Sequence, residues 1–166
     1  EQVNGFSQVH VSGTGGGPKY GNILVMPFGK GMDQLNHIDY RKDETIRLGY
    51  YATEFQRTGI YTEITTAPRA SFYRFTYPED SLKSLLVDAG FFLGEQPTPD
   101  AREAQQFVGS EIQIISDHEV MGYTRIRGGW NNGRAYTVYF YAVTDHPFVQ
   151  TVSYTHLRAH ETGAYL

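Results

Sequence analysis

The sequence lacks cysteine, holds a single tryptophan and has only nine leucines among its 166 residues. The absence of cysteine excludes disulfide scaffolds and thiolate metal sites. No apolar run approaches the roughly 18 residues that a membrane-spanning helix needs, and the first ten residues lack the basic patch and apolar core of a signal peptide. With 19% charged residues and a net charge of −4, the chain also lacks the basic character typical of nucleic-acid-binding domains.

The residues that are abundant are those typical of strands and turns. The chain has 13 tyrosines, 10 phenylalanines, 15 threonines and 18 glycines. Aromatic and β-branched side chains favour strands, and glycine favours turns. Because leucine and the other helix-filling residues are scarce, the composition excludes helical bundles and coiled coils.

Runs of alternating, β-branched and aromatic residues recur between turn signals. They predict strands at Ile23–Met26, Gly49–Phe55, Ile60–Ala67, Ala70–Tyr77, Leu82–Ala89, Glu111–Ser116, Glu119–Arg127 and Ala135–Val143. Only Gln96–Phe107 has helical character, and it is predicted as a surface loop with one helical turn. Because the strands follow one another without helices between them, the predicted fold class is all-β, an antiparallel β-sandwich.

Strand Ala135–Val143 carries bulky residues on both faces, which predicts a strand that is covered on both sides. The turn before it contains Trp130 next to two asparagines. An exposed indole beside amide groups suits a sugar, because the ring stacks on its C–H face and the amides bond its hydroxyls. A tryptophan that folds back to cap the sandwich is the other reading of this turn.

Three further features have a functional and a structural reading. The glycine-rich stretch Ser12–Gly17 fits neither a phosphate loop nor a dinucleotide fingerprint. It predicts either a loop with positive φ angles or bare backbone that a ligand can approach. His10 is either a hydrogen-bonded structural residue or part of a site. Asp117 and Glu119, two residues apart, are expected on one side of a strand, as a solvated edge or as a pair for acid–base chemistry or Ca²⁺.

Five strings resemble, in order along the chain, the N-terminal region of glycoside hydrolase family 92: GFSQVHVSGTGGG, GNILVMP, GYY, TEITTAPRASFYRFTYP, and GGWNNGRAYTVYFYAV with HPF. The resemblance covers residues 5 to about 148. It implies part of a Ca²⁺-dependent, exo-acting α-mannosidase in which an N-terminal β-sandwich packs on an (α/α)6 barrel. Such an enzyme inverts the anomeric centre with a general acid and a general base, and the resemblance implies a secreted or periplasmic protein.

In the family, the catalytic carboxylates and the main Ca²⁺ ligands belong to the helical domain. The resemblance therefore implies no catalytic and no metal-ligating residue in this chain, and the isolated chain is expected to be inactive. It implies that the residues His10, Ser12, Gly13, Thr14 and Gly15 face the interdomain site and position a mannose-containing glycan. The family often has His, Cys and Asp where this chain has Gln8, Gly16 and Asn22. The rival hypothesis is a stand-alone carbohydrate-binding or structural sandwich without catalysis.

The C-terminal stretch Val152–Leu166 resembles the translation of a sequencing-library adaptor. The adaptor DNA GTC TCT TAT ACA CAT CTC CGA GCC CAC GAG reads VSYTHLRAHE, which matches the start of this stretch. We therefore expect residues 1–150 to form a partial N-terminal sandwich domain that begins after the family's first strands. Residues 151–166 are expected to be an adaptor-derived artefact and not a domain.

Overall fold

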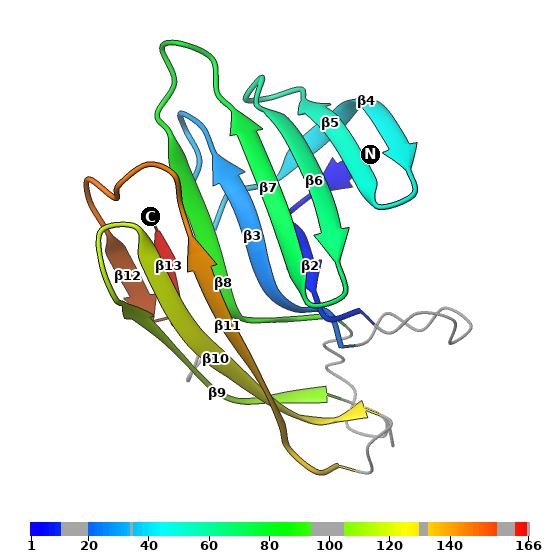
Figure 1. The fold of residues 1–166 in the computed structure, drawn as a ribbon, viewed down its shortest axis with the longest axis vertical. Helices are drawn as coiled ribbons and strands as arrows, with labels where there is room; N and C mark the ends of the chain where they lie inside the picture. The colour runs from blue at the N-terminus through cyan, green and yellow to red at the C-terminus, as the bar shows by residue number, and fades with distance from the viewer. Residues whose placement is uncertain (11–19, 34, 94–104, 130–132, 156–161, 166) are drawn as a thin grey trace. The chain divides into compact units, whose positions relative to one another are not determined.

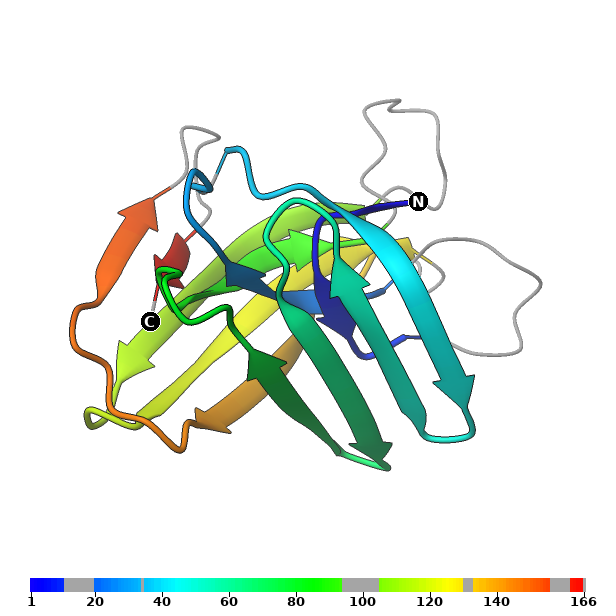
Figure 2. The ribbon, with the colours of Figure 1, turned by 90° about the horizontal axis from the view of Figure 1, so that it is seen from above.

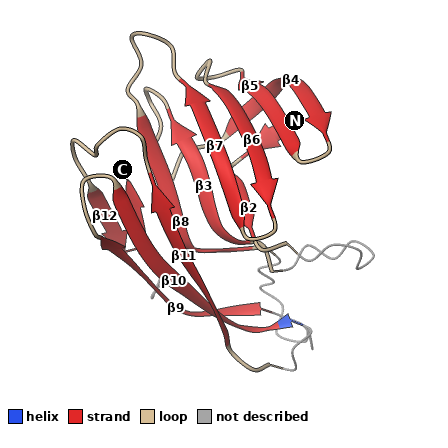
Figure 3. Ribbon diagram, in the orientation of Figure 1, coloured by secondary structure: helices blue, strands red, loops and turns tan. Residues whose placement is uncertain are grey.

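A computed structural model describes residues 1–10, 20–33, 35–93, 105–129, 133–155 and 162–165. These residues form antiparallel sheets and contain no α-helix; the short blue segment in Figure 3 is 3₁₀. Among them there is no helix long and apolar enough to cross a membrane. The all-β, antiparallel prediction is confirmed.

The chain divides into two compact units. The first consists of Glu1–Gly5 and Met26–Leu85, and the second of Phe6–Val25 and Leu86–Leu166. Strands β3 (Asn22–Phe28) and β8 (Ser84–Phe92) each have residues in both units.

The first unit holds a five-stranded sheet in the order β1-β4-β5-β6-β7 (Figure 1). Its strands are β1 (Gln2–Val3), β4 (Asp39–Arg47), β5 (Tyr50–Phe55), β6 (Tyr61–Ala67) and β7 (Ala70–Thr76). Strands β5 and β6 form a hairpin, with the Phe55 N–H donating to the Ile60 carbonyl at 3.0 Å. Phe55 and Ile60 are both completely buried, so this hairpin also supplies part of the core.

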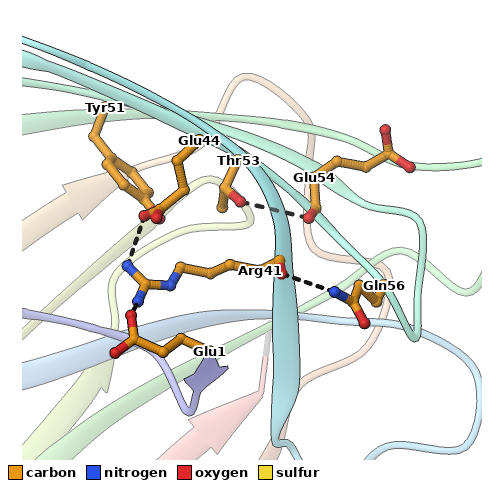
Figure 4. Close-up of polar contacts among 7 residues, drawn as sticks. All are labelled: Glu1, Arg41, Glu44, Tyr51, Thr53, Glu54 and Gln56. Atoms are coloured by element: carbon orange, nitrogen blue, oxygen red, sulfur yellow. Dashed lines mark hydrogen bonds and ion pairs between the residues drawn. The ribbon is translucent and has the colours of Figure 1, made fainter.

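Strand β4 was not predicted, and the polar contacts around Arg41 explain why it forms (Figure 4). Its sequence DYRKDETIR has no apolar alternation, and seven of its nine residues, Tyr40 and 42–47, are exposed. The Arg41 guanidinium donates to Glu44 at 2.6 Å and forms an ion pair with Glu1, while Tyr51 donates to Glu44 at 2.7 Å. The pairing of β4 with β5 shifts register between Arg41 and Glu44, so these contacts hold the strand at its irregular point.

The turn after β5 is organised by the buried carboxylate of Asp39. Its oxygens accept hydrogen bonds from the backbone N–H groups of Tyr40 (2.7 Å), Arg57 (2.8 Å) and Thr58 (3.1 Å), and from the Thr58 hydroxyl (2.8 Å). Asp39 is fully buried, and its donors belong either to β4 or to the loop between β5 and β6.

The second unit holds the three-stranded sheet β11-β10-β9 and most of the five-stranded sheet β12-β13-β8-β3-β2. The three-stranded sheet consists of β9 (Gln105–Ile114), β10 (Glu119–Gly128) and β11 (Tyr136–Val143). These strands lie side by side in both views, from yellow-green to orange in Figure 2. The remaining strands of the other sheet are β2 (Phe6–Gln8), β12 (Val152–Thr155) and β13 (Thr162–Tyr165).

The core of the second unit comes from one face of β10 and from the apolar residues of β3 and β8. Val120 and Ile126 are at most 1% exposed, and Leu24 is 2% exposed. The predicted strand Leu82–Ala89 is confirmed as β8, although it begins at Ser84 and extends to Phe92. The predicted helical turn is wrong at its end, because Gln105–Phe107 belongs to β9, where pairing with β10 overrides local helix propensity.

The tail that resembles an adaptor is paired in the structure. Strand β13 pairs with β8 through Gly163↔Asp88, Ala164↔Val87 and Tyr165↔Leu86, and β12 pairs with β13. A natural strand has its backbone paired in this way, whereas an accidental translation has no physical reason to contribute stability.

Deleting residues 152–166 separates these two readings. If the tail is adaptor-derived, we expect the free energy of unfolding to change by no more than about 1 kcal/mol, as for positions outside the core. The measurement is a pair of chemical denaturation curves for the two chains. A clear loss of stability on deletion would show that the pairing with β8 makes the tail part of the fold.

Replacing the buried carboxylate of Asp39 tests what organises the first unit. Asp39→Ala leaves the N–H groups of Arg57 and Thr58 without their acceptor, so we expect the free energy of unfolding to fall by about 2–4 kcal/mol. The matched control is Asp33→Ala, because Asp33 also accepts backbone N–H bonds, from Leu35 and Asn36, but is exposed. Equal losses in the two variants would contradict the role of burial at Asp39.

Candidate functional site

Residues from several parts of the second unit lie close to the short stretch Tyr20–Asn22. Tyr20 follows the glycine-rich segment, and its ring contacts Gly129, which precedes Trp130. A Cβ placed on Gly129 would lie 2.6 Å from the Tyr20 hydroxyl oxygen, so only glycine fits at this distance. The residue that follows the glycine-rich segment is therefore in direct contact with the residue that precedes Trp130.

Gly21 makes the corresponding close approach to His10. A Cβ on Gly21 would lie 2.9 Å from Cε1 of His10 and 2.5 Å from Cδ1 of Leu93. The Leu93 N–H donates to the Gly21 carbonyl at 2.8 Å, which joins the end of β8 to the start of β3. His10, Leu93 and Gly129 thus meet the chain at two consecutive residues, Tyr20 and Gly21.

A chain of polar side chains runs behind this meeting point. The Tyr136 hydroxyl of β11 donates to Oδ1 of Asn22 in β3 at 3.2 Å, and Nε2 of Gln105 in β9 donates to the Tyr136 hydroxyl at 3.2 Å. Oε1 of Gln105 accepts the Tyr20 backbone N–H at 3.1 Å. The rings of Tyr20 and Tyr136 pack at a centroid distance of 5.7 Å. The polar chain therefore links both sheets of the second unit.

The polar chain is made of groups that are neutral at physiological pH. Desolvation raises the pKa of Tyr136 from its ordinary value, although the hydrogen bonds with Asn22 and Gln105 lower it in part. The neutral phenol acts as donor and acceptor at once. Amide and hydroxyl groups of this kind orient a polar ligand or a loop but do not transfer protons in the way that carboxylates do.

The same stretch carries backbone and side-chain features that cost free energy. Val9, Tyr20 and Ile23 have positive φ angles of 57°, 71° and 57°, which non-glycine residues rarely adopt. Asn22 is completely buried, yet its Nδ2 has no hydrogen-bond partner among the described residues. Residues held in such backbone conformations cost about 1–3 kcal/mol each and cluster at functional sites.

The structure describes one of the predicted site residues, His10, and not the others. His10 is exposed, with Nε2 lying 3.0 Å from the Ser7 hydroxyl and 2.9 Å from the Ser7 carbonyl oxygen. The other predicted positions, namely Ser12, Gly13, Thr14, Gly15 and Trp130, lie outside the described residues. The site role of all six stays a prediction.

Sequence reasoning missed Tyr20, Gln105 and Tyr136, which no local motif marks. Tyr136 reads as one aromatic in a strand full of them, and Gln105 belongs to a stretch with helical character. Their shared location depends on which strands pair, and that is a property of the whole sheet.

The prediction that Asp117 and Glu119 lie on one side of a strand is wrong. Asp117 lies in the bend between β9 and β10, not in a strand, so it does not share a strand face with Glu119. The bend forms because the N–H groups of Ile115 and Ser116 both donate to the Glu119 carbonyl. The Glu119 side chain is bonded to Ser116 at 2.8 Å and to the Tyr141 hydroxyl, as expected of a structural carboxylate.

A family profile and a known protein match the sequence of this chain. The sequence profile described as "Glycosyl hydrolase family 92 N-terminal domain" matches residues 1–164. An "uncharacterized secreted glycosidase" of Arthroderma benhamiae is 33% identical over 92 residues, which make up 49% of this chain and 12% of that protein.

Solved structures give the same result over almost the whole chain. A family GH92 α-mannosidase from Bacteroides thetaiotaomicron, solved in complex with mannoimidazole, is 25% identical and superposes with a TM-score of 0.78 over 99% of this chain. A second GH92 family glycosyl hydrolase is 20% identical with a TM-score of 0.72, and it shows the shared fold alone. The chain spans 23% and 24% of these two proteins.

Removing one hydroxyl tests whether the polar chain joins the two sheets. Tyr136→Phe leaves Oδ1 of Asn22 and Nε2 of Gln105 without their shared partner, so we expect the free energy of unfolding to fall by about 1–3 kcal/mol. Tyr139→Phe removes the same hydroxyl from a residue of β11 that is 78% exposed and should change stability little. Denaturant titrations of both variants provide the comparison, and a neutral Tyr136→Phe would disprove the link.

Proposed function

Since residues 1–164 belong to the N-terminal domain of glycosyl hydrolase family 92, we propose that this chain is the sandwich part of an enzyme that removes terminal α-linked mannose from glycans. The similarity to an α-mannosidase structure over 99% of the chain supports this substrate. Because the chain spans only 23% of that protein, the activity proposed is that of a longer polypeptide.

One observation carries the proposed role of this domain, namely the convergence of chain flanks on Tyr20–Asn22. His10 and Tyr20 bracket the glycine-rich segment, and Gly129 precedes Trp130. Since Gly129 contacts Tyr20 and His10 contacts Gly21, residues that flank the two segments lie close together. This supports a single site in which His10, Ser12–Gly15 and Trp130 contact a mannose-containing glycan.

The part played by these residues is positioning. The Tyr136–Asn22–Gln105 hydrogen bonds hold the backbone at Tyr20 where the glycine-rich segment ends. The positive φ angles at Val9, Tyr20 and Ile23 mean that the surrounding contacts impose this backbone path. A wall of fixed backbone and neutral polar groups can orient sugar hydroxyls without taking part in proton transfer.

Catalysis in this proposal belongs to the helical domain that the family resemblance implies. An inverting glycosidase uses a general acid and a general base whose carboxyl groups stand about 6.5–9.5 Å apart, which leaves room for the attacking water. This chain would form one wall of the interdomain active site, and the helical domain would provide both carboxyl groups.

Calcium is expected from the resemblance, which implies that its main ligands belong to the helical domain. Across the described ranges there is no group of three or more His, Asp or Glu side chains that could hold a metal ion. The proposal derives no step through the ion in this chain.

The expected location of the enzyme is outside the cytoplasm, either secreted or periplasmic. The relative from Arthroderma benhamiae is described as secreted, which supports the extracellular alternative. Glycans with terminal mannose are then the proposed partners, together with the helical domain of the same polypeptide.

Gly15→Ala in a full-length enzyme that carries this domain tests the proposal. If bare backbone at Gly15 approaches the mannose or the helical domain, a Cβ there intrudes, and kcat/KM should fall by at least about tenfold, or roughly 1.4 kcal/mol of transition-state binding. The melting temperature should change little. Trp130→Ala separates the two readings of that residue, since a capping tryptophan would lower stability more than activity, whereas a ring that stacks on the sugar would lower kcat/KM.

The isolated chain serves as the negative control in the same assay. It should not turn over any α-mannoside, because the groups of general acid–base catalysis each contribute about 10²–10⁴-fold. Turnover by the purified chain that persists after contamination controls would overturn the assignment of catalysis to another domain. Full activity of Gly15→Ala would overturn the positioning role.

A further inference from the structure

One face of the three-stranded sheet in the second unit exposes large side chains to solvent. The register pairs Tyr123 with Tyr139 and Met121 with Tyr141, and residues paired across antiparallel strands share a face. Tyr139 is 78% exposed, Tyr141 58% and Met121 42%. Both faces of β11 were predicted to be covered, and this face contradicts that prediction.

Polar residues of β9 complete the rows in which these aromatic residues stand. Glu111 pairs with Tyr123, and Gln113 pairs with Met121, so each row runs across all three strands. Successive rows lie about 7 Å apart along a strand, which brings neighbouring rings to a common surface. The rings of Tyr123 and Tyr139 are in contact, with centroids 6.1 Å apart. The face therefore offers ring surfaces flanked by a carboxylate and an amide.

The row next to the one that holds Tyr123 and Tyr139 has small residues at both of its ends. It consists of Gly109, Arg125 and Thr137. A Cβ placed on Gly109 would meet no atom within 4 Å, so the space above this residue is open. Glycine inside a strand weakens it and often marks a place where a ligand approaches the backbone. The change of height beside the tyrosine row provides such a place.

The charges on this face balance and are largely bonded to neighbours. Two acidic residues, Glu111 and Glu119, face two basic residues, Arg125 and Arg127. Gln113 donates to Glu111 at 2.5 Å, and Nε of Arg127 donates to Gln106 at 2.8 Å. The Tyr141 hydroxyl donates to Glu119 and lowers the pKa of that carboxyl. Charge complementarity therefore favours a neutral occupant over a polyanion or a basic peptide.

We propose that this outer face of β9–β10–β11, around Tyr139, Tyr141 and Gly109, binds a neutral glycan chain. Phenol rings stack on the C–H faces of pyranose rings, and the amide and carboxylate groups beside them accept or donate hydrogen bonds to hydroxyls. A protein partner fits less well, since the centres of protein interfaces are depleted in charge, whereas Glu111 and Arg125 lie within and next to the tyrosine row.

This binding surface is independent of the positioning role proposed above. Tyr136 of β11 contributes to the Asn22 cluster from the opposite face of the strand, because residues 136 and 139 differ by an odd number of positions. A glycan held along β11 would therefore not touch the Tyr136 hydroxyl. The test below measures binding without catalysis and can fail or succeed whether or not the mannosidase proposal holds.

The experiment is affinity electrophoresis of the 166-residue chain through gels that contain soluble α-mannan or dextran as two neutral glycans. We expect retardation by at least one of them. Tyr139→Ala and Tyr141→Ala should each weaken binding by about fivefold to tenfold, since each removes one stacking ring. Tyr139→Phe keeps the ring and should retain most of the binding. Gly109→Gln fills the open space and should weaken binding by a similar factor.

The matched control is Phe72→Ala, which removes an aromatic residue of β7 that is 76% exposed in the other unit. It should leave retardation unchanged, and the melting temperature of every variant is measured alongside. Absence of retardation in both gels overturns the proposal, as does an equal loss in Phe72→Ala. Dimerisation in sedimentation equilibrium that Tyr139→Ala abolishes would also overturn it, because the face would then be an interface between copies.

Discussion

The Tyr136 hydroxyl is the contact on which the geometry of the candidate site depends. It donates to Asn22 and accepts from Gln105, so one oxygen joins β11, β3 and β9. These residues are separated by up to 114 positions in sequence, yet the hydrogen bonds place them side by side. A phenol is neutral at physiological pH, so the one oxygen can donate and accept at the same time. The backbone at Tyr20, which is bonded to Gln105, therefore inherits its position from the sheets and not from its own loop.

The free energy needed to hold this arrangement comes from the packed strands around it. Positive φ angles at Tyr20 and Ile23 each destabilise the folded state, as does Nδ2 of Asn22, which has no partner in the part of the chain that the structure describes. Ile23 is itself buried, and Leu24 is 2% exposed in the same strand. Burial of this apolar strand offsets the local cost, so strain and core lie within a few residues of each other. A backbone path that the core imposes is also one that does not relax when a ligand is absent.

Local pattern was sufficient to predict most strands and insufficient where tertiary contacts decide. Strands β5, β6 and β7 alternate clearly and were predicted within a residue or so of their bounds. Strand β4 was missed because Arg41, Glu44 and Glu1 hold it through ion pairs, which leave no hydrophobic period in the sequence. The sequence predicts a site at the glycine-rich segment and His10, which stays a prediction, and it gives no sign of Tyr20, Gln105 and Tyr136. Strand pairing brings these residues together, and their spacing along the chain does not predict that they meet.

Strand β11 shows why composition alone cannot tell a covered face from an open one. Its alternate residues are bulky on both sides, which predicts burial on both sides, yet Tyr139 and Tyr141 are exposed. Tyrosine permits either outcome, because its ring packs like an apolar group while its hydroxyl tolerates water. On the inner face the phenol of Tyr136 is bonded to Asn22 and Gln105, and on the outer face that of Tyr141 is bonded to Glu119. The same residue type therefore stabilises the sheet from within and leaves ring surface available outside, so one strand carries both a structural hydrogen bond and the exposed rings of the proposed glycan-binding face.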